Sequence, residues 1–439
     1  IFYPHPPNGQ TAVTTFVPDG KAFTNITDAT GLLFEAEDDA GVVNYQYFSN
    51  RQLKSTLLNA TVSNAVEYDE YGRQTKLTEN NSGITLYEYN AYGELEQQTD
   101  ANNNSNTLSY DVLGRDLQKT GNEGTYSYQY VTGGNGLNQI QTVIGPGNIS
   151  YNYTYDNLRR TTKIEENINS QVFTTLFFYD QFNNINKQTF PSGFAIEHSY
   201  NSHGYHTQII RSDNGQMIWQ VNKMNALGQY TEYKFGNGIT TLKSFTNFGY
   251  PATSTTGSMM DLGFDFNQQN GNLFDRYGID NFENFQYDFG DRLTSSHVVG
   301  QNPILLNYES NGNILNKTGI GTYSYDGVKK HAVTTVDNAD NLINTTTQSV
   351  SYTPYNKAEN IAEGDYQLNF IYGPDQERKK TELFYQSNLQ TTRFYIGNYE
   401  KTIGGTNTIE VHYINCGSGL AAMYVIENSV GNMHYVSTD

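Results

Sequence analysis

The feature that most constrains this chain is a short motif that returns at a fixed spacing. Tyr-Asp, two free positions and Gly-Arg occur at Tyr68–Arg73 and again at Tyr110–Arg115, and a degraded copy, Tyr89–Glu94, lies between them. The steps from Tyr68 to Tyr89 and from Tyr89 to Tyr110 are equal, at about 21 residues each, which is within the range of known repeat periods. A period of this size indicates a protein built from successive copies of one supersecondary unit.

The aromatic residue that opens the motif, here called the anchor, can be followed along nearly the whole chain. One period before Tyr68 lies Tyr47, and the long gap after Tyr110 is expected to contain a degraded copy near Tyr130. The later anchors are Tyr155, Tyr179, Tyr200, Met224, Phe245, Phe266, Tyr287, Tyr308, Tyr325, Tyr352, Tyr372 and Tyr395. Period and motif recur together, so the repeat sets the architecture of most of the chain.

Each repeat is expected to be a β-hairpin. A second aromatic or aliphatic residue usually stands two positions before the anchor, as Tyr87 does before Tyr89, which places both side chains on one face of a strand. The Asp-x-x-Gly segment then ends the strand, and positive φ is expected at Gly72, Gly114 and Gly312. Two strands of about seven residues and two turns fill one period. The sequence therefore predicts an all-β, helix-poor chain with consecutive hairpins side by side.

We interpret the motif residues as structural. The Asp bonds the backbone of its own turn, Gly takes positive φ, and the Arg guanidinium can tie a turn to a carboxylate or carbonyl of the next repeat. An anion-binding role for the Arg residues is the alternative. The motif residues assigned in this way are Tyr68, Asp69, Gly72, Arg73, Tyr89, Gly93, Tyr110, Asp111, Gly114, Arg115, Tyr155, Asp156, Tyr179, Asp180, Tyr287, Asp288, Arg292, Tyr325 and Asp326.

These spaced motifs resemble the YD-repeat (Rhs-repeat) family, which includes bacterial Rhs and wall-associated toxins, the C component of the insecticidal Tc toxins, and the teneurin YD shell. The resemblance covers about residues 25–439. Its last part resembles the Rhs core at Tyr325–Gly327, Lys330–Thr334 and Tyr352–Lys357, and the end, His434–Asp439, resembles the start of the family's Asp-His-Leu-Gly-Ser stretch.

The resemblance implies a hollow shell, or cocoon, made by a spiral of repeated hairpins of about 21 residues. In toxin members such a shell encloses a C-terminal effector polypeptide. The family's self-cleaving aspartyl protease is not assigned here, because its Asp-Pro-x-Gly motif does not occur. We divide the chain into a Pro-rich lead-in from an upstream region (1–24), a YD-repeat shell (25–400) and Rhs-core-like strands (401–439) truncated before the core end.

Composition agrees with a thin wall. The chain carries 26 basic and 45 acidic residues, a net charge of −19, and its 36% hydrophobic content includes 36 Tyr residues. We expect a wall one sheet thick, with aromatic rings stacked along one face and no second layer of strands. The acidic balance argues against nucleic acid or an anionic membrane as partner. The single Cys416 excludes an internal disulfide framework and is expected to be a small buried residue.

The other candidate residues are expected to have packing or surface roles rather than catalytic or metal-binding ones. His198, His203 and His206 form one local cluster. Metal ligation would need a third or fourth ligand in a closed geometry, and we expect surface or packing roles. The pairs Glu35 with Glu37 and Glu165 with Glu166 are expected on solvated strand faces rather than in a glycosidase cleft. Trp219 is expected to pack in the wall, with sugar stacking or partner contact as the alternative. No catalytic residue, cofactor or metal is assigned.

The preferred hypothesis is a non-catalytic Rhs-repeat shell that encapsulates a C-terminal toxin or effector polypeptide of a secreted bacterial polymorphic toxin. The expected partners are that effector, in cis beyond Asp439, and possible secretion machinery or upstream domains. The alternative is a cell-surface adhesion or carbohydrate-binding repeat module. The expected localisation is secreted or cell-surface. No signal peptide or membrane span is visible, and we expect the natural protein to extend further at both ends.

Overall fold

The structure is a computed structural model that describes residues 9–16, 21–59, 61–278, 281–338 and 340–437. In these residues there is no α-helix, and one 3-10 turn, η1 (Pro146–Asn148), is the only helical segment. All other regular structure is β-strand, which confirms the expected all-β architecture. The prolines at positions 4, 6, 7 and 18, used to define the lead-in, and the last residue of the core-like stretch, Asp439, lie outside the described residues.

The strands are short and follow one another in hairpins. The first group is β1 (Thr11–Phe16), β2 (Ala22–Thr27), β3 (Leu33–Asp38), β4 (Gly41–Tyr47), β5 (Leu53–Leu58), β6 (Thr61–Tyr68), β7 (Gln74–Glu79), β8 (Gly83–Tyr89), β9 (Leu95–Thr99), β10 (Ser105–Tyr110), β11 (Asp116–Gly121), β12 (Gly124–Tyr130), β13 (Ile140–Gly145), β14 (Ile149–Tyr155), β15 (Thr161–Ile168), β16 (Gln171–Tyr179), β17 (Ile185–Thr189), β18 (Ala195–Tyr200), β19 (His206–Arg211), β20 (Met217–Met224) and β21 (Tyr230–Phe235).

The second group is β22 (Thr240–Phe245), β23 (Pro251–Thr256), β24 (Met260–Phe266), β25 (Leu273–Tyr277), β26 (Phe282–Tyr287), β27 (Leu293–Val298), β28 (Ile304–Tyr308), β29 (Ile314–Lys317), β30 (Gly321–Tyr325), β31 (Val333–Val336), β32 (Gln348–Tyr352), β33 (Ala358–Glu363), β34 (Tyr366–Tyr372), β35 (Arg378–Tyr385), β36 (Asn388–Ile396), β37 (Tyr399–Gly404), β38 (Asn407–Cys416), β39 (Gly419–Glu427) and β40 (Val430–Tyr435).

The anchors mark the ends of alternate strands. Every even-numbered strand from β4 to β34 ends on an anchor, including the degraded copy expected near Tyr130. β36 ends at Ile396, immediately after Tyr395. The predicted hairpin repeat is therefore confirmed along the described chain, because the motif starts where each strand stops.

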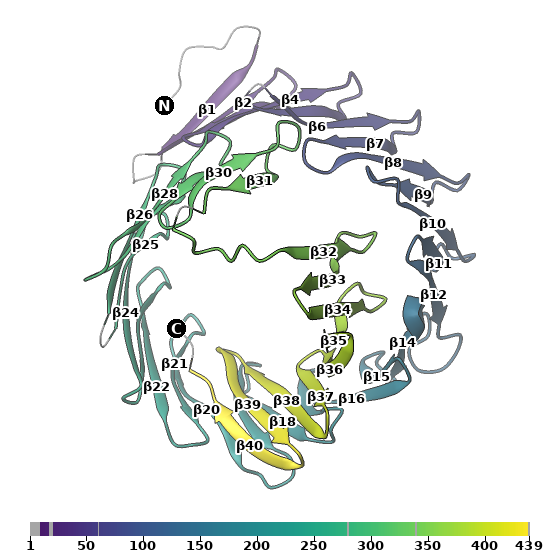
Figure 1. Cartoon of the computed structure of the whole chain (residues 1–439), viewed down its shortest axis with the longest axis vertical. Helices are drawn as coiled ribbons and strands as arrows, with labels where there is room; N and C mark the ends of the chain where they lie inside the picture. Colours follow the sequence, from purple (N-terminus) through teal and green to yellow (C-terminus); the bar gives the residue numbers. More distant parts are fainter. Residues whose placement is uncertain (1–8, 17–20, 60, 279–280, 339, 438–439) are drawn as a thin grey trace. The chain divides into compact units, whose positions relative to one another are not determined.

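The chain divides into two compact units, which are described separately. Unit 1 comprises Ile1–Ser105, Phe245–Ala252 and Leu262–Thr345, and unit 2 comprises Asn106–Ser244, Thr253–Asp261 and Thr346–Asp439. In unit 1, β1–β9 and β25–β31 form runs of antiparallel neighbours (Figure 1). In unit 2, β11–β21 form another such run, and β32–β40 form a separate nine-stranded sheet.

Two of the expected domain boundaries fall inside strands. β1 pairs with β2, with Phe16 opposite Ala22, and residue 25 lies within β2. The boundary at residue 401 lies within β37, which pairs with both β36 and β38. The division into lead-in, shell and core-like strands stays a prediction about the whole protein.

Unit 2 contains a second layer that was not predicted from the sequence. Side chains of β14–β21 and of β36–β39 form one buried hydrophobic cluster, in which Ile168, Trp219 and Ile414 have no exposed surface. The C-terminal strands thus pack against the β16–β20 region (Figure 1). The expectation of a wall with no second layer is wrong here, because strands within Asn388–Glu427 supply apolar side chains that cover those of the repeat strands. The packing role of Trp219 is confirmed.

Backbone strain at the turn glycines gives a first prediction. Gly72, Gly114 and Gly312 have φ values of +79°, +74° and +89°, as expected. An added Cβ at Gly312 meets no atom within 4 Å, so the cost of a side chain there comes from the backbone alone. Gly312→Val should lower the free energy of unfolding by about 1–2 kcal/mol. Chemical denaturation measures this loss.

Gly327→Val is the matched control. Gly327 lies in the same unit, its Cβ position is also open, and its φ lies outside the left-handed region. Equal destabilisation by both variants would contradict the role assigned to positive φ.

Candidate functional site

The Asp of the motif organises its own turn. Asp69 Oδ1 accepts hydrogen bonds from the backbone N–H groups of Tyr71 and Arg73, both at 2.9 Å. The Gly72 N–H donates to the Asp69 carbonyl at 3.0 Å and closes the turn. Asp69 Oδ2 accepts from Arg73 Nε at 2.7 Å. One carboxylate thus satisfies the backbone donors of the turn and holds the guanidinium.

The same arrangement recurs wherever both the Asp and the Arg of the motif are present. Asp111 with Arg115, Asp156 with Arg160, and Asp288 with Arg292 make the same Nε–Oδ2 contact at 2.7 Å. In repeats that lack Arg, an amide replaces it, as Asn184 Nδ2 donates to Asp180 Oδ2 at 2.9 Å. In the degraded copy the donor and the acceptor exchange places, and Asn90 Nδ2 donates a hydrogen bond to Glu94 Oε2 at 2.7 Å. Asp326 instead accepts from the Val328 and Lys329 amides in a longer turn.

The glycine position requires positive φ whatever residue occupies it. Arg159, Asn183 and Asp291 stand at this position in their repeats, with φ values of +65°, +71° and +59°. Gly93, in the degraded copy, has φ of +87°. The turn geometry is therefore set by the repeat, and Asn, Asp or Arg adopts it at some cost in backbone energy.

The anchor hydroxyl bonds to the preceding repeat. Tyr89 donates its hydroxyl proton to the carbonyl of Gln74 at 2.8 Å, and Gln74 is the residue opposite the previous anchor, Tyr68. The β7–β8 pairing begins only at Lys76 opposite Leu86, so the Gln74 carbonyl lies beyond it. The Tyr hydroxyl thus satisfies a carbonyl that the strand pairing leaves out.

This hydroxyl–carbonyl bond repeats along both units. Tyr130, Tyr155, Tyr179, Tyr200, Tyr287, Tyr308, Tyr325 and Tyr372 make the same bond to the start of the preceding return strand. Met224 has no hydroxyl, and Tyr230, which is opposite Met224 in the pairing, donates to the His206 carbonyl instead. A register shift of the strand pairing accompanies most anchors, as between Glu67 and Tyr68.

The guanidinium stacks on the anchor of the following repeat. Arg73 lies 4.7 Å from the ring centre of Tyr89, Arg115 4.0 Å from Tyr130, and Arg160 4.6 Å from Tyr179. Arg292 lies 4.9 Å from Tyr308 and also donates to the Glu309 carbonyl at 3.2 Å. Each Asp–Arg pair therefore positions a cation over the next aromatic ring. The expected tie to a carbonyl of the next repeat is found for Arg160 and Arg292.

The histidine cluster separates into a pair and an exposed residue. His198 Nδ1 lies 3.0 Å from His206 Nε2 across neighbouring strands, and the His206 ring lies against Trp219. His203 is exposed on the turn. Burial lowers the pKa of His198 to about 4 and also lowers the pKa of His206. Among the described residues, no group of three or more His, Cys, Asp or Glu side chains is arranged to hold a metal ion.

Unit 2 also contains a hydroxyl–imidazole pair that the sequence did not reveal. Ser192 Oγ lies 2.6 Å from His412 Nε2, and His412 Nδ1 donates to the Tyr424 carbonyl at 2.8 Å. Such a pair can activate a hydroxyl nucleophile. Here His412 has no exposed surface and is surrounded by the rings of Phe190, Phe194 and Tyr424. The two side chains are 220 positions apart, so no local pattern could have indicated the pair.

The carboxylate expectation needs one correction. Glu166, predicted on a solvated face, has a side chain only 12% exposed and pairs with Lys379 Nζ at 2.9 Å. The prediction is wrong because the sequence did not indicate the second layer. The C-terminal sheet covers the strand face that carries Glu166. Cys416 is partly buried at the end of β38, and burial raises the pKa of its thiol.

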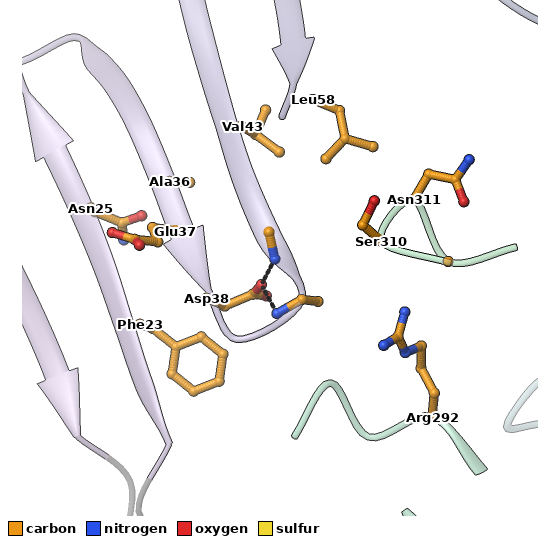
Figure 2. A pocket seen from close by; sticks show the side chains of 13 residues that line it. Phe23, Asn25, Ala36, Glu37, Asp38, Val43, Leu58, Arg292, Ser310 and Asn311 are labelled. Atoms are coloured by element: carbon orange, nitrogen blue, oxygen red, sulfur yellow. Dashed lines mark hydrogen bonds between the residues drawn. The ribbon is translucent and has the colours of Figure 1, made fainter. Parts of the chain in front are cut away.

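A pocket in unit 1 lies where early hairpins meet later motif turns. It has a volume of about 420 Å³ and is lined by Phe23 and Asn25 of β2, the Asp38–Gly41 hairpin, and Arg292 with the Ser310–Gly312 turn. Asp38 Oδ1 accepts hydrogen bonds from the backbone amides of Ala40 and Gly41 (Figure 2). A second pocket of about 540 Å³ shares Leu58, Ser310 and Asn311 with the first and adds Lys330 and His331.

These pockets mark a seam between two sets of turns. Lys21 forms an ion pair with Asp291, and the His331 amide donates to Asn81 Oδ1 at 3.1 Å. The turns after β26, β28 and β30 thus face the loops that join β1 to β2, β3 to β4, β5 to β6 and β7 to β8. No sequence pattern indicated the seam, because its contacts join residues about 250 positions apart.

The described part of the chain contains no helix that is long and apolar enough to span a membrane. No family model matches the chain. A comparison with curated proteins gives no significant match either.

Solved structures give a clear match. A chain of the Photorhabdus luminescens Tc holotoxin pore superposes with a TM-score of 0.82 at 14% identity, over 95% of this chain and 26% of that chain. The crystal structure of TcdB2-TccC3-TEV gives 0.82 at 12% identity, over 98% and 29%. That of TcdB2-TccC3 gives 0.81 at 14% identity, over 95% and 27%.

This chain has the YD-repeat fold. The matched structures are Tc toxin chains, the group that the Tyr-Asp motif resembles, and the match extends over nearly all of this sequence. The chain spans between a quarter and a third of the length of these solved chains. The match therefore establishes the fold of this chain, and any activity or partner is a proposal.

The Asp–Arg pair of each YD motif gives a prediction about acid stability. The Arg115 guanidinium and the backbone amides of the turn lower the pKa of Asp111 below its usual value of 3.8. A lowered folded-state pKa adds stability that is present above the unfolded pKa and lost as the pH falls through the folded one. Asp111→Asn should therefore lower the melting temperature at pH 7.

The difference between wild type and Asp111→Asn should shrink as the pH falls below about 4. Asp39→Asn, on an exposed hairpin, is the control and should leave the melting temperature unchanged at either pH. A constant difference between pH 7 and pH 3 would contradict the ionic contribution of Asp111.

The buried histidine pair gives a second prediction about acid stability. Folding favours the neutral form of His198, whereas it favours the charged form of Asp111. Because the folded pKa of His198 lies near 4, below its ordinary 6.5, protonation favours the unfolded chain. The contribution of neutral His198 to the free energy of unfolding is fully present above pH 6.5 and is lost as the pH falls toward 4. His198→Gln should reduce the fall in melting temperature between pH 7 and pH 4.5. His203→Gln, on the exposed turn, should leave it as in the wild type.

Proposed function

We propose that this chain is a non-catalytic wall segment of a YD-repeat shell that encloses a toxin or effector polypeptide of a secreted bacterial protein. The observation that carries the proposal is the match to Tc toxin chains over 95% of this sequence. The expected closed, hollow form follows from that resemblance.

The motif contacts support a wall that holds itself together. Most tyrosine anchors donate their hydroxyl to the preceding repeat, and the motif Arg residues paired with Asp stack on the following anchor, as at Tyr89 and Arg73. A sheet linked in this way needs no thick core beneath every strand. Physical confinement is then the mechanism, because a wall without free strand edges separates the enclosed chain from targets and proteases.

The proposal assigns no chemistry to the chain. The motif carboxylates are occupied by turn amides and Arg side chains, and Ser192 and His412 lie among packed aromatic rings. The partner is the enclosed polypeptide in cis, with secretion machinery or upstream domains as further partners, and the site of action is outside the producing cell or at its surface.

An adhesion or carbohydrate-binding module is the second candidate. The observation in its favour is the unit 1 pocket, where the exposed ring of Phe23 stands beside Asn25 and Glu37 (Figure 2). An aromatic ring beside polar side chains suits a sugar. Glycan binding that Phe23→Ala abolishes, together with failure of the shell test below, would favour this function.

The shell hypothesis predicts a large particle that protects what it encloses. In small-angle X-ray scattering, the radius of gyration should exceed the roughly 22 Å of a compact globule of this length. An unstructured reporter peptide fused after Asp439 should resist added protease. The same reporter fused before Ile1 is the matched control and should be cleaved. A radius no larger than that of the compact globule, with equal cleavage of both fusions, would overturn the proposal.

A further inference from the structure

Four ionisable side chains from two sheets meet inside unit 2. Lys379 of β35 places Nζ 2.9 Å from Glu166 Oε2 of β15 and 3.4 Å from Asp375 Oδ2. The Tyr151 hydroxyl, from β14, donates to Asp375 Oδ1 at 3.0 Å. Lys379 Nζ also lies 5.0 Å from the centre of the Tyr151 ring. An amine and two carboxyl groups thus share one site between two sheets that are far apart in the sequence.

Three of the four side chains have little contact with water, and the Glu166 side chain is 12% exposed. Lys379 is 8% exposed and Tyr151 4% exposed. Glu166 stands opposite Tyr151 on one neighbouring strand and opposite Phe173 on the other, and both rings belong to the buried cluster of unit 2. Aromatic groups therefore flank the carboxyl on both sides along the sheet.

Close backbone packing fixes the geometry. A Cβ at Gly373 would overlap the Tyr151 hydroxyl, and one at Gly145 would lie 2.9 Å from Pro374. The turn that carries Asp375 therefore rests directly on β13 and β14. This close approach holds Asp375 and Lys379 beside the strands that carry Tyr151 and Glu166, and proximity of this kind favours reaction between the groups.

The burial of Glu166 changes its chemistry. Desolvation raises the pKa of this carboxyl above its usual value, even with Lys379 beside it. Burial also weakens the preference for an ion pair in general, because buried charges lose their hydration. The contact of Lys379 with Glu166 Oε2 lacks hydrogen-bond geometry, and that oxygen has no hydrogen-bond partner among the described residues.

We propose that Lys379 and Glu166 condense to an isopeptide bond that joins the C-terminal sheet covalently to the repeat sheet of unit 2. The site brings together the groups that this reaction uses: an amine against a buried carboxyl group, and a second carboxyl group within reach of the amine to act as base.

The reaction needs no oxidant or cofactor. The neutral Lys379 Nζ attacks the Glu166 carboxyl carbon and forms a C–N bond. Asp375 takes the proton from nitrogen and delivers it to a Glu166 hydroxyl. The C–O bond then breaks, and one water leaves. The product is a secondary amide, and Asp375 returns to its carboxylate form.

Asp375 suits the role of base by its placement. It is more exposed than Glu166, at 40% against 12%, and it lies within reach of the amine. The Tyr151 hydroxyl and the Glu377 amide donate to its Oδ1, so Oδ2 is the oxygen that faces Lys379.

Mass spectrometry of the purified chain tests the proposal. The intact mass should be lower than the sequence mass by one water. Tryptic digestion should yield a branched peptide that joins the Glu166 segment to the Lys379 segment, with no cleavage after Lys379. An intact mass equal to the sequence mass, with normal cleavage after Lys379, would overturn the proposal.

Matched variants separate the bond from other losses of water. Lys379→Arg keeps the positive charge but cannot condense in this way, and it should restore the sequence mass. Asp375→Asn keeps the shape of the side chain, removes the proton acceptor and should leave most chains unlinked. Circular dichroism confirms that each variant is folded. A water loss that persists in folded Lys379→Arg would place the modification elsewhere and contradict the assignment.

Discussion

The structure depends on the bond between an anchor hydroxyl and a backbone carbonyl of the preceding repeat. The strand pairing stops short of the motif edge, as between β7 and β8, and the Tyr89 hydroxyl satisfies the carbonyl left there. Without that donor, each repeat would keep an unpaired carbonyl at its edge. The Asp–Arg pair then acts on the same ring, since it holds a guanidinium over its face.

Local interactions explain why so much of the fold could be predicted from sequence. Turn, bulge and anchor lie within a single copy of the motif, and the next anchor is one period away. The alternation around Tyr87 and Tyr89, the end of each strand and the positive φ of Gly72 all follow from short-range chemistry. The reversed pair Asn90–Glu94 shows that the turn tolerates a change of polarity when donor and acceptor exchange places.

Long-range packing explains what could not be predicted. Glu166 has the sequence surroundings of a solvated strand residue, and only the covering sheet, with Lys379, makes it buried. Ser192 and His412 meet for the same reason. Low overall hydrophobicity favours a wall without a second layer, but the buried apolar residues are concentrated in β14–β21 and β36–β39 and produce one core in unit 2. An average over the whole chain conceals that concentration.

The anchor bonds and the Asp–Arg contacts between repeats have the same direction. A repeat offers its carbonyl and its guanidinium to the repeat after it, and it receives a phenol ring in return, as Gln74 and Arg73 do from Tyr89. Any row of such hairpins therefore has two chemically different ends, like a filament with a plus and a minus end. Whole repeats can be inserted or deleted without loss of this complementarity, whereas a repeat joined in the opposite orientation would find no partner.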